Sequence, residues 1–315
     1  FSVLALIIYQ FIQVVLHYSF ITDNITLQEI KSNGFSTLSK ISEEKISQIK
    51  LRRFRNFIIQ ISNTHTTYQG LWIGFSVFFV GSQLNKIQKK GLKILNVILI
   101  IVLALWLYFI SARMPLLALL TSILVTAIFF SNFSRTKLFK LGFFFFGVLI
   151  IALSFNNPFS IRVKEYYNTG LTLLESDSKA SEFNSSNVRN GIYYCDLKLI
   201  EKAPFLGVGI GDIQEELNRC YSEEIGAKVY TWHQYNTHNQ YAFFWISSGL
   251  LGLVSFFYLI FFLFKKAIKN NNYLLFYFTC LTTIIFFTEN LLERSDGVIF
   301  FSFFSVLLFF NQKKL

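Results

Sequence analysis

The fold of this sequence is restricted most by eight apolar runs, most of them close to the length that crosses a membrane. A transmembrane helix needs about 20 mostly apolar residues to cross roughly 30 Å of hydrocarbon. Charged residues make up 15% of the chain, against about 25% in soluble domains, and 53% of residues are hydrophobic. We therefore predict an all-α polytopic membrane protein with about eight transmembrane helices, at about 1–21, 68–84, 93–111, 115–131, 138–155, 240–264, 273–288 and 297–311.

The same composition excludes several other classes. The apolar content excludes a disordered chain, and three cysteines are too few for a disulfide scaffold. The first residue, Phe1, already lies within an apolar run and follows no basic leader. We therefore expect 1–21 to be a span and not a signal peptide, in a chain whose N-terminal part is missing.

The distribution of the net charge of +11 predicts the topology. Four connections, at 85–93, 132–140, 265–271 and the tail from 312, together hold twelve lysines and arginines and no acid. All four fall on one side if the spans alternate. The positive-inside rule makes that side cytoplasmic.

The opposite, outer side then carries most of the polar chemistry. We divide the chain into first transmembrane helices (1–155, including an outer segment 22–67), a large periplasmic loop (156–239) and C-terminal helices (240–315). Apolar residues at helical spacing predict an amphipathic helix over about 38–62, which lies on the membrane surface or packs on the chain's own spans. Nucleotide donors are not expected outside a bacterial cell, so a transferase there would need an activated donor carried in the membrane.

Two arginines on the outer side are candidates for binding an anion. Arg113 lies between two apolar runs, where its permanent charge suits a lipid phosphate, or snorkels to ordinary headgroups. Arg189 falls in the first turn of a helix predicted over 187–202, with Asn187 as its N-cap. Because that end of a helix prefers anions, a bound anion would explain the arginine, unless it is simply solvated.

The run Gly207 to Asp212 resembles a nucleotide-binding loop only superficially. No Lys-Ser/Thr follows it and no βαβ pattern surrounds it, so a tight loop that allows close backbone approach is the better interpretation.

His238 lies where the large loop re-enters the membrane. A histidine can act as a general base near neutral pH, and Asn239 can orient it or a substrate hydroxyl; the alternative is an ordinary interfacial histidine. His233 is five residues earlier, which is not the spacing of a helical zinc site, so we expect no metal.

Two further groups have both a structural and a functional interpretation. Cys195 and Cys220 share the outer loop and can form a disulfide in an oxidising compartment, although spacing alone does not settle their pairing. The cluster Glu289, Glu293, Arg294 and Asp296, at the outer end of a span, is either a structural ion-pair group or part of a substrate cleft.

The order of these elements resembles the O-antigen ligase and polymerase family of bacterial polytopic membrane proteins. The resemblance covers most of the chain from residue 65 onward. It is carried by HTTYQGLWIGF (65–75), SARMPLLALL (111–120), VRNGIYYCDLKLIEKAPFLGVGIGD (188–212), THNQYAFFWISSGLLGL (237–253) and ENLLERSDG (289–297).

This resemblance implies an inner-membrane glycosyltransferase whose active site faces the periplasm. Its donor would be an undecaprenyl-diphosphate-linked glycan and its acceptor a sugar hydroxyl on lipid A–core. It would be surrounded by membrane lipid and would use no metal, cofactor or nucleic acid. Arg113 and Arg189 would hold the diphosphate and His238 would be the base of an inverting transfer. The matched segments also supply candidate substrate-binding residues: Asn239, His65, Tyr68, Gly207, Gly209, Glu289 and Arg294.

Other functions share parts of this pattern. A repeat-unit polymerase and a protein O-glycan transferase would use the same donor with a different acceptor. A lipid-linked glycan flippase would need charged or broken spans at midplane depth, and these spans are nearly free of charge except at their ends. A purely structural scaffold would leave the arginine, histidine and glycine of the outer loop without an explanation.

Overall fold

The computed structural model describes residues 2–32, 43–110, 112–130, 167–178 and 183–310, with isolated residues at 37, 41, 136, 142, 143 and 147. Within these residues every regular element is a helix, which confirms the all-α prediction. Most of the predicted span 138–155 lies outside the described residues. In chain order the elements are α1 (Ser2–Leu16), α2 (Tyr18–Thr22), α3 (Leu27–Ser32), α4 (Glu43–Ser62), α5 (Thr66–Gln83), α6 (Lys90–Phe109), α7 (Arg113–Phe130), α10 (Ser185–Lys202), α11 (Ile213–Cys220), η3 (Tyr221–Ile225), η4 (Lys228–Thr231), α12 (Gln240–Lys269), α13 (Tyr273–Ile285), η5 (Leu291–Glu293) and α14 (Ser295–Phe310).

Three helices of the described chain, α6, α7 and α12, are long and apolar enough to cross a membrane. The predicted span 1–21 is bent by 77° after α1, and counting this bent pair as one span gives up to four. α13 and α14 are apolar but shorter. These helices fit a multi-pass membrane protein, and the number of eight spans stays a prediction.

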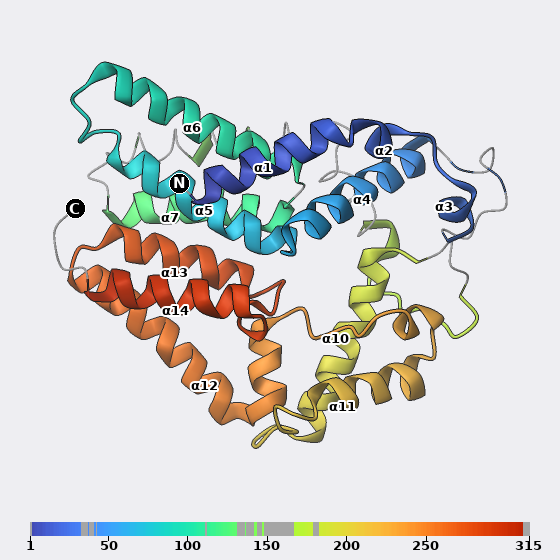
Figure 1. Cartoon of the computed structure of the whole chain (residues 1–315). Helices are drawn as coiled ribbons and strands as arrows, with labels where there is room; N and C mark the ends of the chain where they lie inside the picture. The colour runs from blue at the N-terminus through green and yellow to red at the C-terminus, as the bar shows by residue number, and fades with distance from the viewer. Residues whose placement is uncertain are drawn as a thin grey trace.

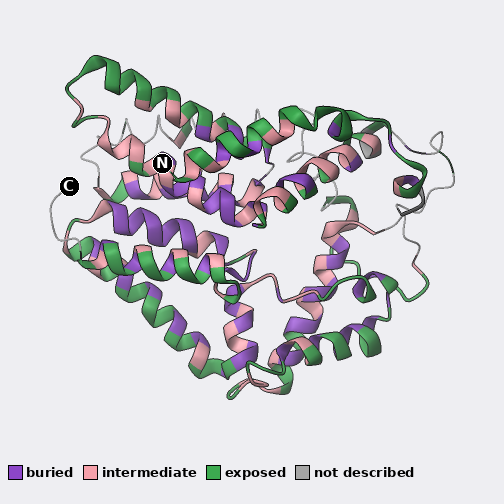
Figure 2. Cartoon of the chain, in the orientation of Figure 1, coloured by how far each residue is buried: buried purple, intermediate pink, exposed green. Residues whose placement is uncertain are grey.

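The bundle is built around α13, which is buried along most of its length, whereas α6 exposes most of its apolar side chains (Figure 2). The phenol of Tyr277 on α13 donates to the backbone oxygen of Gly74 on α5 at 2.9 Å. Its ring stacks on Phe78 with 3.7 Å between centroids. Many of the 39 phenylalanines are used in this way, because aromatic rings fill the space between helices and form edge-to-face pairs.

A buried amide joins three of the helices. Gln10 of α1 donates to Gln69 of α5 at 2.9 Å and accepts from the indole of Trp106 of α6 at 3.0 Å. A polar group removed from water must find a partner inside the protein, so this network fixes how α1 lies against α5 and α6.

Helix α4 corresponds to the predicted amphipathic helix 38–62, but it begins at Glu43. Its buried face packs on α1 and α2, where the ring of Phe57 lies 5.3 Å from that of His17 and 6.3 Å from that of Phe20. Arg53 of α4 pairs with Glu29 of α3 at 2.5 Å. Of the two interpretations left open by the sequence, the structure shows the helix packed on its own chain.

A smaller unit is formed by α10, α11 and the two short helices after them. Cys195 of α10 and Cys220 of α11 are joined by a disulfide, with 5.8 Å between their Cα atoms. The face of α10 that carries Ile192, Cys195 and Leu199 is buried, as its sequence periodicity predicts. α10 contacts the first half of α12, which docks this unit against the bundle.

Helix α12 is broken at Gly249, whose φ of 63° and ψ of −162° are not helical. Figure 1 shows the two halves as a sharp V, with the loop between α10 and α11 at its apex. The backbone oxygen of Phe205, in that loop, would lie 2.0 Å from a Cβ at residue 249, so only glycine allows this approach.

The connections that carry lysines and those that carry the candidate site residues lie at opposite ends of the bundle (Figure 1). The lysine-bearing connections α5–α6 and α12–α13 lie at one end of the bundle. The starts of α5, α7 and α12 lie at the other end, together with the α13–α14 connection. Most of the residues predicted to bind substrate are therefore at this second end.

Candidate active site

His238 lies in a tight bend immediately before α12. Its φ of 46° is left-handed, which is uncommon for a residue with a side chain. The bend is held because the His238 amide donates to the side-chain oxygen of Asn236 at 3.2 Å and the Thr237 hydroxyl lies 2.9 Å from the side-chain oxygen of Asn290. Strained backbone of this kind is concentrated at functional sites.

Asn239 caps α12. Its side-chain oxygen accepts from the amides of Tyr241 at 3.0 Å and Ala242 at 3.2 Å. The oxygen that we predicted to orient His238 or a substrate hydroxyl is therefore used to begin the helix. The cap fixes where α12 begins and so fixes the position of His238, the residue before the cap.

Glu289 faces His238 across the site. Its carboxylate oxygen lies 4.0 Å from the imidazole Nδ1, which has no hydrogen-bond partner within the described residues. Burial, reinforced by the positive charges of Arg189 and Arg294, lowers the pKa of His238 to about 4. Burial, helped by Glu293, raises the pKa of Glu289 to about 7, against the opposing pull of Arg189 and Arg294. His238 is thus an unprotonated imidazole at neutral pH, beside a carboxyl group that gains or loses its proton near neutrality.

A second histidine lies within reach of the same charges. His65 is the N-cap of α5, and its Nδ1 accepts from the Thr67 amide at 3.4 Å. Burial, together with the positive charges of the nearby Arg55, Arg294 and Arg189, lowers the pKa of His65 to about 4. The charges of Arg189 and Arg294 lower the pKa values of His65, His238 and Glu289, so these five side chains lie near enough to one another to form one candidate site.

Arg55 is a part of this site that the sequence did not single out. It extends from α4, and its guanidinium donates to the Thr66 hydroxyl at 3.0 Å, one residue from His65. Its charge was visible in the predicted amphipathic helix. Only the packing of α4 against α5 places it at the site.

Arg189 lies further along its helix than predicted. The N-cap of α10 is Asn184, and the side chain of Asn187 closes a capping box by accepting from the Asn184 amide at 2.9 Å. The prediction of Asn187 as the N-cap was therefore wrong, because α10 starts at Ser185. Arg189 is in the second turn, where the helix dipole acts on it less. Its place in the cluster of charges is the stronger reason to consider it a ligand-binding residue.

Tyr68 and Arg113 are placed by a close contact between α5 and α7. A Cβ on Gly70 would lie 2.6 Å from the Pro115 ring, so this glycine lets the start of α7 approach α5. Arg113 is the first residue of α7. Tyr68 is buried, and its phenol donates to the backbone oxygen of Asn290 at 3.3 Å. In the structure Tyr68 joins α5 to the α13–α14 connection.

Gly207 and Gly209 lie against the backbone of α12. A Cβ on Gly207 would come within 2.6 Å of the Gly249 nitrogen. The Gly209 amide donates to the backbone oxygen of Ser247 at 3.1 Å. The close contact at Gly207 and the φ of 97° at Gly209 account for both glycines without a ligand, and a role in substrate binding stays a prediction.

The end of the α13–α14 connection is ordered by polar contacts. Glu293 accepts from the side-chain amides of Asn236 at 2.7 Å and Asn290 at 2.8 Å. Arg294 follows directly and contributes its charge to the site. In this cluster Glu293 holds the two asparagine side chains, Glu289 lies beside His238, and the charge of Arg294 lowers the pKa of both His65 and His238.

Asp196 is a buried acid that the sequence analysis did not single out. Neither of its carboxylate oxygens has a hydrogen-bond partner within the described residues, and burial raises its pKa well above 3.8. It lies four residues after Ile192 on the buried face of α10, so helical periodicity could have identified it. Tyr221 is near enough for the Asp196 charge to affect its pKa.

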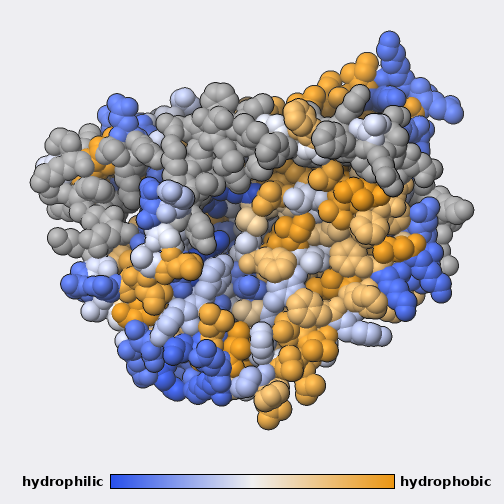
Figure 3. All heavy atoms as spheres, turned by 180° about the vertical axis from the view of Figure 1, so that it is seen from behind, coloured by the Kyte–Doolittle hydropathy of each residue, from blue (hydrophilic) through white to orange (hydrophobic). Residues whose placement is uncertain are grey.

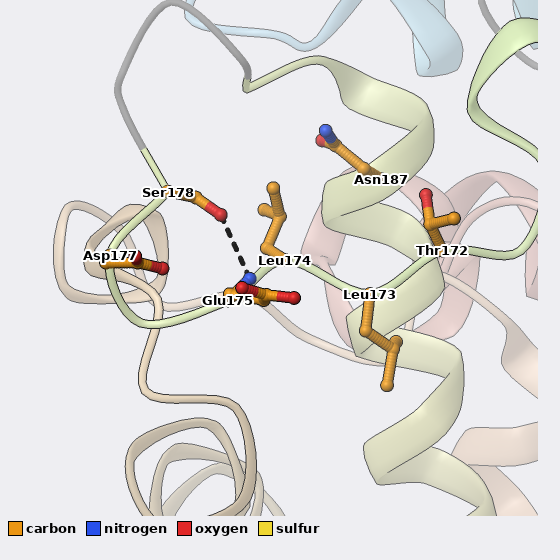
Figure 4. Close-up of a pocket in the computed structure, with 7 residues that line it drawn as sticks. All are labelled: Thr172, Leu173, Leu174, Glu175, Asp177, Ser178 and Asn187. Atoms are coloured by element: carbon orange, nitrogen blue, oxygen red, sulfur yellow. Dashed lines mark hydrogen bonds between the residues drawn. The ribbon is translucent and has the colours of Figure 1, made fainter.

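A cavity of about 420 Å³ lies apart from these residues, beside the start of α10 (Figure 4). The Glu175 amide donates to the Ser178 hydroxyl at 3.0 Å on its wall. Among the described residues, no group of three or more His, Cys, Asp or Glu side chains is arranged to hold a metal ion, here or elsewhere. The cavity is lined by Thr172, Leu173, Leu174, Glu175, Asp177, Ser178 and Asn187.

A comparison with known protein families identifies a match over about half of the chain. The sequence profile described as O-antigen ligase matches residues 97–257. The match includes Arg113, Arg189 and His238 and ends before Glu289. A search of characterised proteins gave no significant match.

Proposed function

Because the chain belongs to the O-antigen ligase family, with its role of membrane glycosyl transfer in O-antigen assembly, we propose that it joins a finished glycan to lipid A–core. The donor is the glycan on undecaprenyl diphosphate, and the acceptor is a sugar hydroxyl. The observation that carries the proposal is the convergence of a neutral histidine, a buried carboxyl group and at least two arginines at one end of the bundle.

His238 is the general base. With a pKa of about 4, its imidazole is unprotonated at neutral pH and accepts the proton of the acceptor hydroxyl. The hydroxyl oxygen forms a bond to the anomeric carbon as the bond from that carbon to the diphosphate oxygen breaks. Undecaprenyl diphosphate leaves with the bonding electrons, and a single displacement inverts the anomeric configuration.

Glu289 supports the histidine. When His238 takes up the proton it becomes an imidazolium, 4.0 Å from the Glu289 carboxyl group. The carboxylate form stabilises that cation and holds the ring in position. In this proposal Glu289 acts through His238 and does not bind the substrate directly.

The arginines bind the diphosphate. Arg189 and Arg294 supply the positive potential that already reaches both histidines, and this potential stabilises the charge that develops on the leaving group. Arg113, at the start of α7, holds the membrane-proximal phosphate. Guanidinium groups suit this task because they donate two parallel hydrogen bonds and remain charged.

The site faces the periplasm in this proposal. The lysine-rich connections lie at the opposite end of the bundle, which the positive-inside rule assigns to the cytoplasm. A chain with about eight spans in the inner membrane would then present His238 on the side where the lipid-linked donor is displayed.

Deletion of the gene followed by gel analysis of lipopolysaccharide tests the proposal. A ligase deletion leaves uncapped lipid A–core and accumulates polymer on the lipid carrier. Core that carries a single repeat unit would instead indicate a repeat-unit polymerase, and an unchanged glycan profile would contradict both. Return of the wild-type gene, but not of a His238→Ala gene expressed at the same level, should restore capped chains.

A further inference from the structure

The loop between α10 and α11 carries an exposed apolar surface that the proposed reaction does not use. Residues 203–211 read APFLGVGIG and contain no charged or hydrogen-bonding side chain. Phe205, Leu206 and Ile210 are 69%, 79% and 74% exposed. These three large apolar side chains lie within six residues. A cluster of exposed apolar side chains of this kind marks a site that contacts another molecule or a membrane.

Part of the backbone of this loop is hydrogen-bonded within the protein. The amide of Gly207 donates to the Ala203 oxygen at 3.0 Å, and that of Val208 donates to the Ile246 oxygen at 2.7 Å. The loop also accepts at Pro204, from the Leu250 amide at 2.9 Å. These paired groups do not need water as a partner, which suits a loop at the membrane surface.

The position of the loop identifies the partner. It lies against the break of α12, at the apex of the V in Figure 1, towards the end of the bundle that carries the α13–α14 connection. The second half of α12 continues from this apex as a candidate membrane span and exposes Leu251, Val254 and Tyr258. Figure 3, seen from behind, shows hydrophobic side chains protruding at the same lower end and extending along the side of the candidate spans.

We propose that Phe205, Leu206 and Ile210 insert into the lipid at the membrane surface and anchor the α10–α11 unit there. The apolar surface of the loop is continuous with the face of α12 that meets lipid. The anchor keeps α10, and with it Arg189, at the depth of the membrane surface. This inference depends on α12 crossing the membrane and not on the transfer reaction.

Fluorescence quenching tests the insertion. Leu206→Cys, in a Cys280→Ala background with the Cys195–Cys220 disulfide retained, is labelled with an environment-sensitive dye and reconstituted into phosphatidylcholine–phosphatidylglycerol nanodiscs. Leu197→Cys is the matched control, because Leu197 is also an exposed leucine (61%) but lies on α10, away from the loop. Ile210→Cys is a second probe if Leu206→Cys does not fold.

The inserted loop predicts a blue-shifted emission from the Leu206 label. It also predicts a loss of roughly half of this emission with brominated lipid, because interfacial anchors lie about 5–10 Å into the headgroup–acyl boundary. The Leu197 label should be quenched by aqueous iodide instead. Equal iodide quenching of the two labels would overturn the proposal. Protection of the Leu206 label from both quenchers would also overturn it, since a protein surface would then cover the loop.

Discussion

The replacement of Gly249 by alanine tests how the break in α12 is maintained. A residue with a side chain at φ 63° and ψ −162° is strained by about 1–3 kcal/mol. The added Cβ would also lie 2.0 Å from the Phe205 oxygen, a backbone atom that no side-chain rotation can move away. The loop must therefore withdraw from α12.

This withdrawal weakens the hydrogen bonds between the loop and α12, first those nearest Gly249, from Val208 to Ile246 at 2.7 Å and from Leu250 to Pro204 at 2.9 Å. Each contributes about 0.5–1.5 kcal/mol, so the loss of these two bonds and the backbone strain together cost roughly 2–6 kcal/mol. We expect the thermal midpoint of purified Gly249→Ala in detergent to fall by roughly 5 °C or more. Indole fluorescence reports the change, because Trp245 donates to the Pro204 oxygen at 3.0 Å in the same contact.

Gly211→Ala is the matched control in the same loop. A Cβ there would meet no atom within 4 Å, and its φ is not in the positive range. Its free energy of unfolding should change by no more than about 0.5 kcal/mol, as for an ordinary surface substitution, so its thermal midpoint should stay close to that of the wild type. If Gly249→Ala and Gly211→Ala unfold at the same temperature, the close packing at the α12 break does not hold the loop in place.

Three further predictions concern ionisable groups. His238→Ala should lower the transfer rate about 10²–10⁴-fold. In the wild type kcat/KM should fall first near pH 7, as Glu289 gains its proton, and again towards pH 4, as His238 does; in Glu289→Gln only the lower step should remain, and an acid limb at 6.5 in that variant would contradict the buried histidine. Glu289→Gln should reduce kcat about 10–100-fold with the donor KM unchanged, the effect expected from loss of one charged partner; a raised KM alone would indicate a substrate-binding role. Asp196→Asn should raise the unfolding free energy at pH 7 by about 1 kcal/mol or more, measured by thermal unfolding. Because folding raises the pKa of Asp196, this residue destabilises the folded protein only above its ordinary pKa of 3.8, and more so as the pH rises. The stability gained with asparagine should therefore vanish near pH 3. A gain that does not depend on pH would contradict this cause.

The helical class and the order of the elements could be predicted from the sequence because apolar runs and basic connections are local signals. The start of α12 at Gln240 follows from Asn239, a residue type that caps helices. The break at Gly249 was not predicted, because glycine is tolerated within an apolar helical run. It arises from the approach of Phe205, a contact across more than 40 residues.

The candidate site shows the same division. His238, Arg189 and Arg113 could be proposed from residue type, position and family resemblance. The pairing of His238 with Glu289 depends on how the α13–α14 connection folds back beside α12, through contacts such as the Gln240 amide with the Phe286 oxygen at 2.8 Å. Arg55 reaches the site only because α4 packs against α5. Both contacts depend on how separate helices pack together, so no local sequence pattern predicts them.

The most direct test of the central claim separates donor binding from transfer. The purified protein is placed in liposomes with a glycan on undecaprenyl diphosphate, and lipid A–core is then added as acceptor. His238→Ala should bind the donor as tightly as the wild type and form almost no product, whereas Arg189→Ala should bind the donor weakly. Transfer by His238→Ala at the wild-type rate would contradict the assignment of His238 as the base.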